Sequence, residues 1–286
     1  MRTNIEERLV TTNHIRLHIV QAGPEAGKPI ILLHGFPETW RSWQNQLAPL
    51  AEAGFRVTAP DQRGYNLSDK PEGLSAYRLN CMVEDVLGLL PVLEKESVSL
   101  VGHDWGGVVA WLAASLYPAR VERLVVLNAP YPSVMLRSIF RDPVQLLRSS
   151  YVLFFQLPVL PEAMLRNNNW ELLVKVMQTS SKPGTFRAED MERYRQAWWK
   201  KGAMRGMLNW YRAFLRRPAA IPAMSRVSVP TQILWGVRDM ALGPELAEAS
   251  LRLCDQGRLT FYEDATHWLQ HEEPERVSAA LLEFLQ

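Results

Sequence analysis

The sequence predicts an α/β protein built on a mostly parallel, doubly wound sheet, with a helical segment inserted between two parts of the sheet. Short apolar runs alternate along the chain with longer segments whose apolar residues repeat at helical spacing. Several of these runs are apolar throughout, as are parallel strands that are covered on both faces. The alternation stops between about residues 132 and 220 and then resumes, which indicates an insertion.

Seven runs are predicted to be strands. Residues 15–21 alternate apolar and polar side chains, which is typical of a half-buried strand, whereas residues 29–33 are apolar throughout. The other predicted strands are residues 55–60, 97–102, 121–127, 231–235 and 258–262. The predicted helices of the sheet region are residues 79–94, 105–117 and 273–286. Pro274 suits the first turn of the last helix, where a backbone N–H is not needed.

The inserted segment divides the predicted core domain in two. Residues 132–220 lack clear strands and are rich in Arg, Met, Trp and Leu, so we expect a mostly helical cap after the sixth strand of the fold. The core domain is then expected to comprise residues 1–131 and 221–286. The strand pattern resumes at Val227, after a segment that contains two prolines.

Composition excludes several classes of protein. The formal net charge is +2 and Lys and Arg are spread along the chain, which argues against a nucleic-acid partner. No stretch approaches the roughly 18 uncharged apolar residues of a membrane span, and the acidic N-terminal residues do not suit a secretory signal. Because Cys81 and Cys254 are too few for a disulfide framework, we expect a reducing, cytoplasmic location.

The strongest local signal is the strand-to-helix turn Gly102-His103-Asp104-Trp105-Gly106-Gly107. Small residues two positions either side of Asp104 permit a sharp turn that lifts the Asp104 side chain above the sheet. The same turn aims backbone N–H groups of the new helix at that side chain. Asp104 is therefore a candidate nucleophile, although an Asp that only caps a helix would give a similar pattern.

Two further polar residues directly follow predicted strands. Asp239 lies just beyond residues 231–235, and His267 lies just beyond residues 258–262. Loops at the carboxyl ends of parallel strands converge on one crevice, so Asp104, Asp239 and His267 are expected to meet there. Their order along the chain is that of nucleophile, acid and base in the α/β-hydrolase fold.

A fourth segment, His34-Gly35-Phe36-Pro37, follows another predicted strand. Its backbone can supply a hydrogen-bond donor to the same crevice. We therefore expect an oxyanion hole formed by the backbone N–H groups of Phe36 and Trp105.

With these motifs the chain resembles the epoxide hydrolases of the α/β-hydrolase superfamily. The matching segments, which span nearly all of the core, are His34–Pro37, Arg63–Tyr65, Ser68–Pro71, Gly102–Gly107 and the surroundings of Asp239 and His267. Asn66 stands where relatives often have Gly, and Asn tolerates the positive φ that such a position requires. The turn around Asp104 also resembles that of haloalkane dehalogenases, so the cap has to distinguish the two families.

The resemblance implies roles for residues in the cap and in the cleft. Epoxide hydrolases hold the epoxide oxygen with two cap tyrosines, which Tyr151 and Tyr211 resemble. Asp104 would then form a covalent ester that water activated by His267, with Asp239 behind it, hydrolyses. The residues expected to contact the substrate are His34, Pro37, His103, Trp210 and Trp268.

The predicted function is hydrolysis of a hydrophobic epoxide, a small molecule, to a vicinal diol by a monomer or homodimer without a cofactor. Two alternatives stay open. A haloalkane dehalogenase would use the same ester chemistry, and the indoles that could hold its halide are Trp170, Trp198, Trp199 and Trp210. A ligand receptor on this fold would bind without turnover. A zinc site is not expected, because Trp268 stands where the helical zinc motif of His267 and His271 requires Glu.

Overall fold

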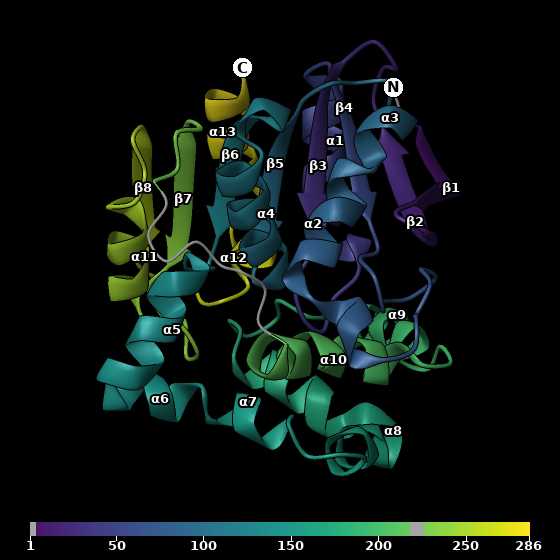
Figure 1. Ribbon diagram of the computed structural model, residues 1–286, viewed down its shortest axis with the longest axis vertical. Coiled ribbons are helices and arrows are strands. Elements are labelled where there is room, and N and C mark those ends of the chain that lie inside the picture. The colour runs from purple at the N-terminus through teal and green to yellow at the C-terminus, as the bar shows by residue number, and fades with distance from the viewer. Residues whose placement is uncertain (1–3, 218–225) are drawn as a thin grey trace.

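A computed structural model describes residues 4–217 and 226–286 and contains one eight-stranded sheet in the order β1-β2-β4-β3-β5-β6-β7-β8 (Figure 1). The strands are β1 Ile5–Thr12, β2 Ile15–Ala22, β3 Lys28–Leu33, β4 Phe55–Pro60, β5 Val98–His103, β6 Val121–Leu127, β7 Thr231–Gly236 and β8 Gly257–Tyr262. The pairs β1–β2 and β2–β4 are antiparallel, and every other neighbouring pair is parallel. The predicted sheet is confirmed.

All seven predicted strands are present with ends within one residue of the prediction. The sequence did not reveal β1, the edge strand. Its first five residues are exposed, Ile5 and Leu9 among them. Its sequence therefore lacks the alternation of apolar and polar residues by which a half-buried strand is predicted. With β1 counted, β6 is the sixth strand.

Helices cover both faces of the sheet, as a doubly wound fold requires. In β3, Ile30 and Leu32 pack in a cluster with residues of α1 (Gln44–Glu52) and α13 (Pro274–Leu285). The alternate residues Ile31 and Leu33 face the other way, into a cluster with α2 (Leu79–Leu87), α4 (Trp105–Leu116) and α11 (Pro244–Leu251). The remaining short elements of this region are α3 Leu89–Val92, α12 Leu269–Glu272 and the 3-10 turns Trp40–Trp43, Leu74–Tyr77 and Pro118–Arg120.

The prediction of one continuous helix over residues 79–94 is wrong, because the structure divides this segment into α2 and α3 at Gly88. Pro91 lacks the N–H that would donate to the Leu87 carbonyl in a continuous helix. A Cβ at Gly88 would also lie 2.0 Å from the Thr12 hydroxyl, so the absence of a side chain at Gly88 lets β1 approach.

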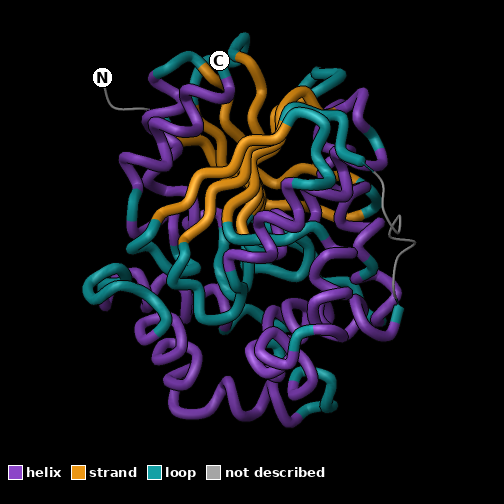
Figure 2. Tube along the Cα trace, turned by 90° about the vertical axis from the view of Figure 1, so that its left-hand side faces the viewer, coloured by secondary structure: helices purple, strands orange, loops and turns teal. Residues whose placement is uncertain are grey.

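In the described part of the chain between β6 and β7, six helices lie beyond the carboxyl ends of the parallel strands (Figure 2). They are α5 Pro132–Arg141, α6 Pro143–Arg148, α7 Ser150–Phe154, α8 Leu160–Thr179, α9 Ala188–Trp198 and α10 Ala203–Arg216. Residues 167–170 interrupt α8 with non-helical backbone angles. We call residues 132–217 the cap; the boundary predicted at residue 220 falls outside the described residues.

Candidate active site

Asp104 lies at the tip of the turn between β5 and α4. Its backbone has φ 50° and ψ −122°, which is outside the regions that residues with a Cβ ordinarily adopt. The turn is tight on both sides of Asp104: a Cβ on Gly102 would lie 2.4 Å from the Gly106 carbonyl oxygen, and one on Gly106 would lie 2.2 Å from that of Leu33. Gly102 and Gly106 are therefore needed because backbone oxygens lie where a Cβ would stand.

One predicted oxyanion donor is already bonded to the Asp104 carboxylate. The Phe36 N–H donates to Asp104 Oδ1 at 2.8 Å. The preceding Gly35 permits this contact, since a Cβ there would lie 2.5 Å from the same oxygen. Trp105 is the first residue of α4, where a backbone N–H has no partner within the helix. Oδ1 therefore lies where a loop N–H can stabilise negative charge, and the Trp105 N–H as the second donor stays a prediction.

The other carboxylate oxygen faces His267. The distance from Asp104 Oδ2 to His267 Nε2 is 3.8 Å, and His267 Nδ1 lies 2.7 Å from Asp239 Oδ2. Burial alone would lower the pKa of His267, but the charge and hydrogen bond of Asp239, with the charge of Asp104, raise it to about 9. Asp104, His267 and Asp239, predicted from separate strand ends, are thus neighbours, with His267 between the two carboxylates.

Asp239 is held in the orientation that the imidazole requires. Its Oδ1 accepts the N–H groups of Ala241 at 2.8 Å and Leu242 at 3.0 Å, and its Oδ2 accepts the Asn128 amide at 2.9 Å. Burial would raise the pKa of Asp239, but His267, Asn128 and the Ala241 N–H lower it. Asn128 was not predicted from the sequence, although its place directly after β6 is the signal that could have found it.

The two cap tyrosines lie side by side above the turn. The ring centroids of Tyr151 and Tyr211 are 5.9 Å apart, and the Tyr211 ring lies 5.0 Å from that of Trp105 and 5.3 Å from that of Phe36. Burial first, and then nearby negative charge that includes Asp104, raises the pKa of both phenols. Both hydroxyls therefore stay protonated at neutral pH and can donate hydrogen bonds.

Comparison with known proteins agrees with this geometry. A model of the α/β hydrolase fold family matches residues 28–274. The chain is 47% identical to the AB hydrolase superfamily protein YfhM of Bacillus subtilis, over 98% of this chain and 97% of that protein. It is 40% identical to epoxide hydrolase 4 of Mus musculus, over 95% of this chain and 77% of that protein.

Among solved structures, the epoxide hydrolase of Bacillus megaterium in complex with an inhibitor superposes with a TM-score of 0.88. It is 30% identical, and the match covers 97% of this chain and 99% of that one. This chain belongs to the epoxide hydrolases of the α/β-hydrolase fold family. Within residues 4–217 and 226–286 of this epoxide hydrolase, no group of His, Cys, Asp and Glu side chains is arranged to hold a metal ion.

The residues predicted to contact substrate are all buried, and their polar side-chain atoms bind other protein groups. The His34 ring nitrogens bond the Gly35 carbonyl and the Gln62 N–H, and His103 Nε2 bonds the His267 carbonyl at 2.8 Å. The Trp210 indole donates to the Arg63 carbonyl, that of Trp268 to Ser180, and the Pro37 carbonyl accepts from Trp198. These hydrogen bonds position loops around the active site, and contact of these five residues with a substrate stays a prediction.

A buried carboxylate that the sequence did not single out lies behind the active site of this epoxide hydrolase. Glu38 is fully buried, and its Oε1 bonds His271 at 2.6 Å and the Tyr194 hydroxyl of α9 at 2.9 Å. Its Oε2 lies 3.2 Å from His103 Nδ1. Burial would raise the pKa of Glu38, but His271 and His103 hold it well below its ordinary value. The ionised Glu38 therefore ties the loop of Phe36 to the cap and to His103.

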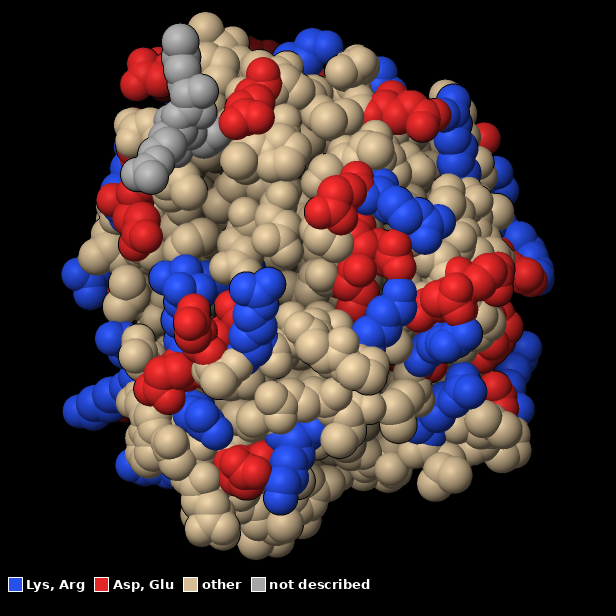
Figure 3. Space-filling view, turned by 180° about the vertical axis from the view of Figure 1, so that it is seen from behind, with Lys and Arg blue, Asp and Glu red and all other residues tan. Residues whose placement is uncertain are grey.

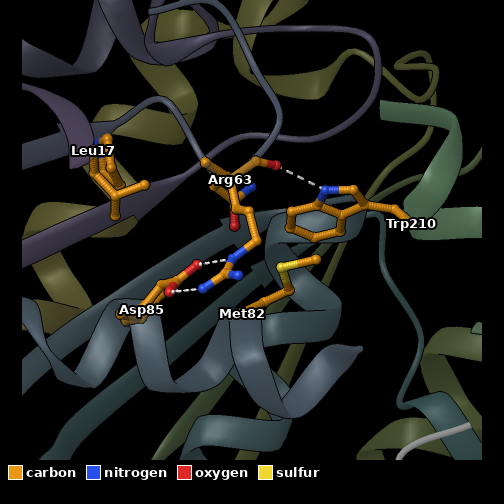
Figure 4. A pocket seen from close by; sticks show the side chains of 8 residues that line it. Leu17, Arg63, Met82, Asp85 and Trp210 are labelled. Carbon is orange, nitrogen blue, oxygen red and sulfur yellow. Dashed lines mark hydrogen bonds and ion pairs between the residues drawn. The ribbon is translucent and has the colours of Figure 1, made fainter. Parts of the chain in front are cut away.

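A second buried ion pair fixes α10 on the core. Figure 4 shows Arg63 bonded to the Asp85 carboxylate while its backbone carbonyl accepts the Trp210 indole N–H at 2.9 Å. The two Arg63–Asp85 hydrogen bonds are 2.7 and 2.5 Å long. Beside them is a cavity of about 10 Å³, too small for a substrate. The loop after β4, which the resemblance included, thus positions the cap helix that carries Tyr211.

Proposed function

We propose that this enzyme hydrolyses a hydrophobic epoxide to a vicinal diol through an ester on Asp104. The observation that carries the proposal is the setting of the Asp104 carboxylate. One oxygen accepts the Phe36 N–H, the other lies 3.8 Å from His267, and two protonated phenols lie above. This arrangement supplies a nucleophile, an oxyanion site, a base and an electrophile in one place.

In the first step Asp104 Oδ2 attacks one epoxide carbon and the carbon–oxygen bond of the ring breaks. Tyr151 and Tyr211 donate hydrogen bonds to the ring oxygen, which becomes an alkoxide and takes a proton from one phenol. A carboxylate is a weak nucleophile in water, but ring strain and partial exclusion of water favour the attack. The Asp104 side chain is only 17% exposed. The product is an alkyl ester.

In the second step His267 removes a proton from a water molecule, which attacks the Asp104 acyl carbon. The oxyanion forms at Oδ1, against the N–H groups of Phe36 and Trp105, and its collapse expels the diol, which takes the proton from the imidazolium. The carboxylic acid left on Asp104 then gives up its proton, which restores the phenol that protonated the alkoxide in the first step. Esterification has by then removed the Asp104 charge that helps to raise the pKa of His267. A larger fraction of the imidazole is therefore unprotonated, and available to accept the proton of water, in the ester than in the free enzyme.

An isotope experiment tests the ester. In a single turnover in H₂¹⁸O with enzyme in excess, the diol should carry unlabelled oxygen from Asp104, and the protein should gain ¹⁸O, read by mass spectrometry of the peptide that contains Asp104. The His267→Gln variant should accumulate the ester as a mass increase on the intact protein. Labelled oxygen in the first-turnover diol would exclude the mechanism.

The cap tyrosines are tested by hydroxyl removal. Tyr151→Phe and Tyr211→Phe should each lower the rate of ester formation, and the double variant should lower it by a factor of about 100 or more, since even one lost donor to a developing oxyanion costs about 3 kcal/mol. The control is Tyr117→Phe, at an exposed position of the core domain just after α4. Unchanged turnover by the double variant would refute the role.

Haloalkane dehalogenation remains the alternative on the same fold. Three of the indoles that could hold a halide are bonded elsewhere: Trp198 to Pro37, Trp199 to Asn169 and Trp210 to Arg63. Diol formation from a panel of aryl and alkyl epoxides, measured beside halide release from 1-haloalkanes, distinguishes the two activities. A cytoplasmic location and a monomer or homodimer remain predictions; Cys81 and Cys254 are free thiols.

A further inference from the structure

The cap carries an apolar surface that no described part of the chain covers. Between residues 140 and 164 ten large apolar side chains are exposed, with Phe140 at 85%, Leu147 at 73% and Val159 at 72%. We call this surface the apolar cap face; its members are Phe140, Val144, Leu146, Leu147, Tyr151, Leu153, Leu157, Val159, Leu160 and Met164. Such a concentration exceeds the scattered apolar residues of an ordinary surface and marks an interaction site.

The face lies at the end of the molecule farthest from the sheet. Figure 1 shows α6, α7 and α8 side by side along that end. Seen from behind, the lowest part of the molecule shows areas without charged side chains next to acidic and basic groups (Figure 3). The exposed apolar residues therefore lie on consecutive short elements of the cap, away from the edge of the sheet.

The charged residues around the face are mainly basic. Residues 132–166 contain four arginines and two acids. Both acids are already engaged, because Asp142 caps α6 through the Val144 N–H and Glu162 pairs with Arg212 at 2.6 Å. The four arginines are Arg137, Arg141, Arg148 and Arg166. Short helices with exposed Leu and Phe beside arginines are typical of segments that lie in a membrane interface.

We propose that the apolar cap face docks on the surface of a bilayer that contains anionic lipids. The apolar side chains would enter the boundary between headgroups and acyl chains, and the arginines would pair with lipid phosphates. This is a peripheral contact, since none of the helices in the described part of the chain is both long and apolar enough to cross a bilayer.

Charge favours a lipid surface over a second copy of this chain. A twofold dimer brings together two copies of the same patch, so two surfaces with an excess of arginine would meet. Anionic lipids complement them instead. The face also contains Tyr151, which is 37% exposed. Given the proposed epoxide hydrolysis, docking would bring Tyr151, whose ring lies 5.9 Å from that of Tyr211, close to lipid that dissolves a hydrophobic epoxide.

Vesicle co-sedimentation tests the docking without reference to turnover. The wild-type enzyme should sediment with vesicles of equal parts phosphatidylglycerol and phosphatidylcholine, and several-fold less with phosphatidylcholine alone or at 0.5 M salt, where salt screens the charges. Phe140→Ser with Leu147→Ser, and separately Arg137→Gln with Arg141→Gln, should each lower the bound fraction at least about threefold.

A matched variant controls for general loss of surface apolarity. Ile5→Ser with Leu9→Ser removes two exposed apolar residues from the edge strand β1 and should leave vesicle binding unchanged. Circular dichroism confirms that each variant is folded. The proposal is overturned by equal binding to neutral and anionic vesicles, by absence of binding, or by a dimer in sedimentation velocity that the Phe140 and Leu147 changes dissociate. None of these outcomes depends on whether epoxides are turned over.

Discussion

Asp104 adopts a backbone conformation that a residue with a Cβ can hold only at a cost. A φ of 50° with a ψ of −122° is glycine-like, and residues in such regions cost on the order of 1–3 kcal/mol. The folded turn holds Asp104 there because β5 and α4 fix both sides. The strain is consistent with a side chain that has to stand clear of the sheet to react.

Asp104→Gly should therefore be more stable than Asp104→Ala. Both variants lose the carboxylate and its bond to Phe36, but only glycine relieves the backbone strain. Glycine loses more entropy on folding, so we expect a net difference in the free energy of unfolding of about 1 kcal/mol. Urea unfolding of the two inactive variants measures it. If Asp104→Ala is the more stable, the turn is not strained.

The pKa of His267 depends on both neighbouring carboxylates. An opposite charge favours the protonated imidazole, so removing one should lower the pKa from about 9. Asp104→Asn should do so, because it mimics the loss of charge in the ester. Nitrogen NMR titration of the histidines measures the change. His18, bonded to Asp61 at 2.7 Å, should titrate as in the wild type. An unchanged His267 titration would show that Asp104 does not influence the base.

At the scale of elements, the strand patterns predicted the sheet closely. Parallel strands buried on both faces have few polar interruptions, so their ends coincide with the ends of the apolar runs. The edge strand β1 lacks this pattern. The helix over residues 79–94 looked continuous because its apolar spacing persists, but Pro91 and the approach of Thr12 break it at Gly88.

The turn between β5 and α4 should tolerate no side chain at Gly106. In Gly106→Ala the new Cβ would overlap the Leu33 and His34 carbonyl oxygens at 2.2 and 2.6 Å, and both belong to the backbone. We expect a loss of about 3 kcal/mol or more in the free energy of unfolding. Gly54→Ala is the matched control, since Gly54 has φ +94° and open surroundings, and should cost about 1 kcal/mol. Urea unfolding compares them; equal losses would contradict the close approach.

At the scale of the whole molecule, polar groups of the cap hold it on the core. The Trp198 indole donates to the Pro37 carbonyl at 2.6 Å, and the neighbouring Tyr194 donates to Glu38. The rings of Tyr194 and Trp198 are stacked with centroids 6.0 Å apart. Pro37 and Glu38 directly follow Phe36, whose N–H is the oxyanion donor. The position of α9 therefore affects the position of that donor.

Tyr194→Phe should weaken this attachment. The change leaves the ring in place but removes a donor from a buried, ionised carboxylate, which costs about 1.5–3 kcal/mol. The free energy of unfolding measured in urea should fall by about that amount. Tyr117→Phe, in which an exposed tyrosine of the core loses its hydroxyl, should have little effect. Equal stability of the two variants would show that the bond to Glu38 does not stabilise the cap.

The sequence by itself determined the sheet, the sharp turn at Asp104 and the loops that carry Asp239 and His267. Each of these depends on local backbone geometry and on the burial of successive residues, which a short stretch of chain records. The Asn66 position is of the same kind: its φ is 36°, as the substitution of Gly by Asn suggested.

Only the tertiary structure decided which polar groups become partners. Asn128 and Asp239 are 111 residues apart, and Glu38 and Tyr194 are 156 residues apart. The tertiary structure likewise decided the partners of four rings at the site. The polar side-chain atoms of His34, His103, Trp210 and Trp268 bind protein groups. A side chain's partner depends on how distant segments pack, because burial requires each polar group to find one and no local pattern specifies which.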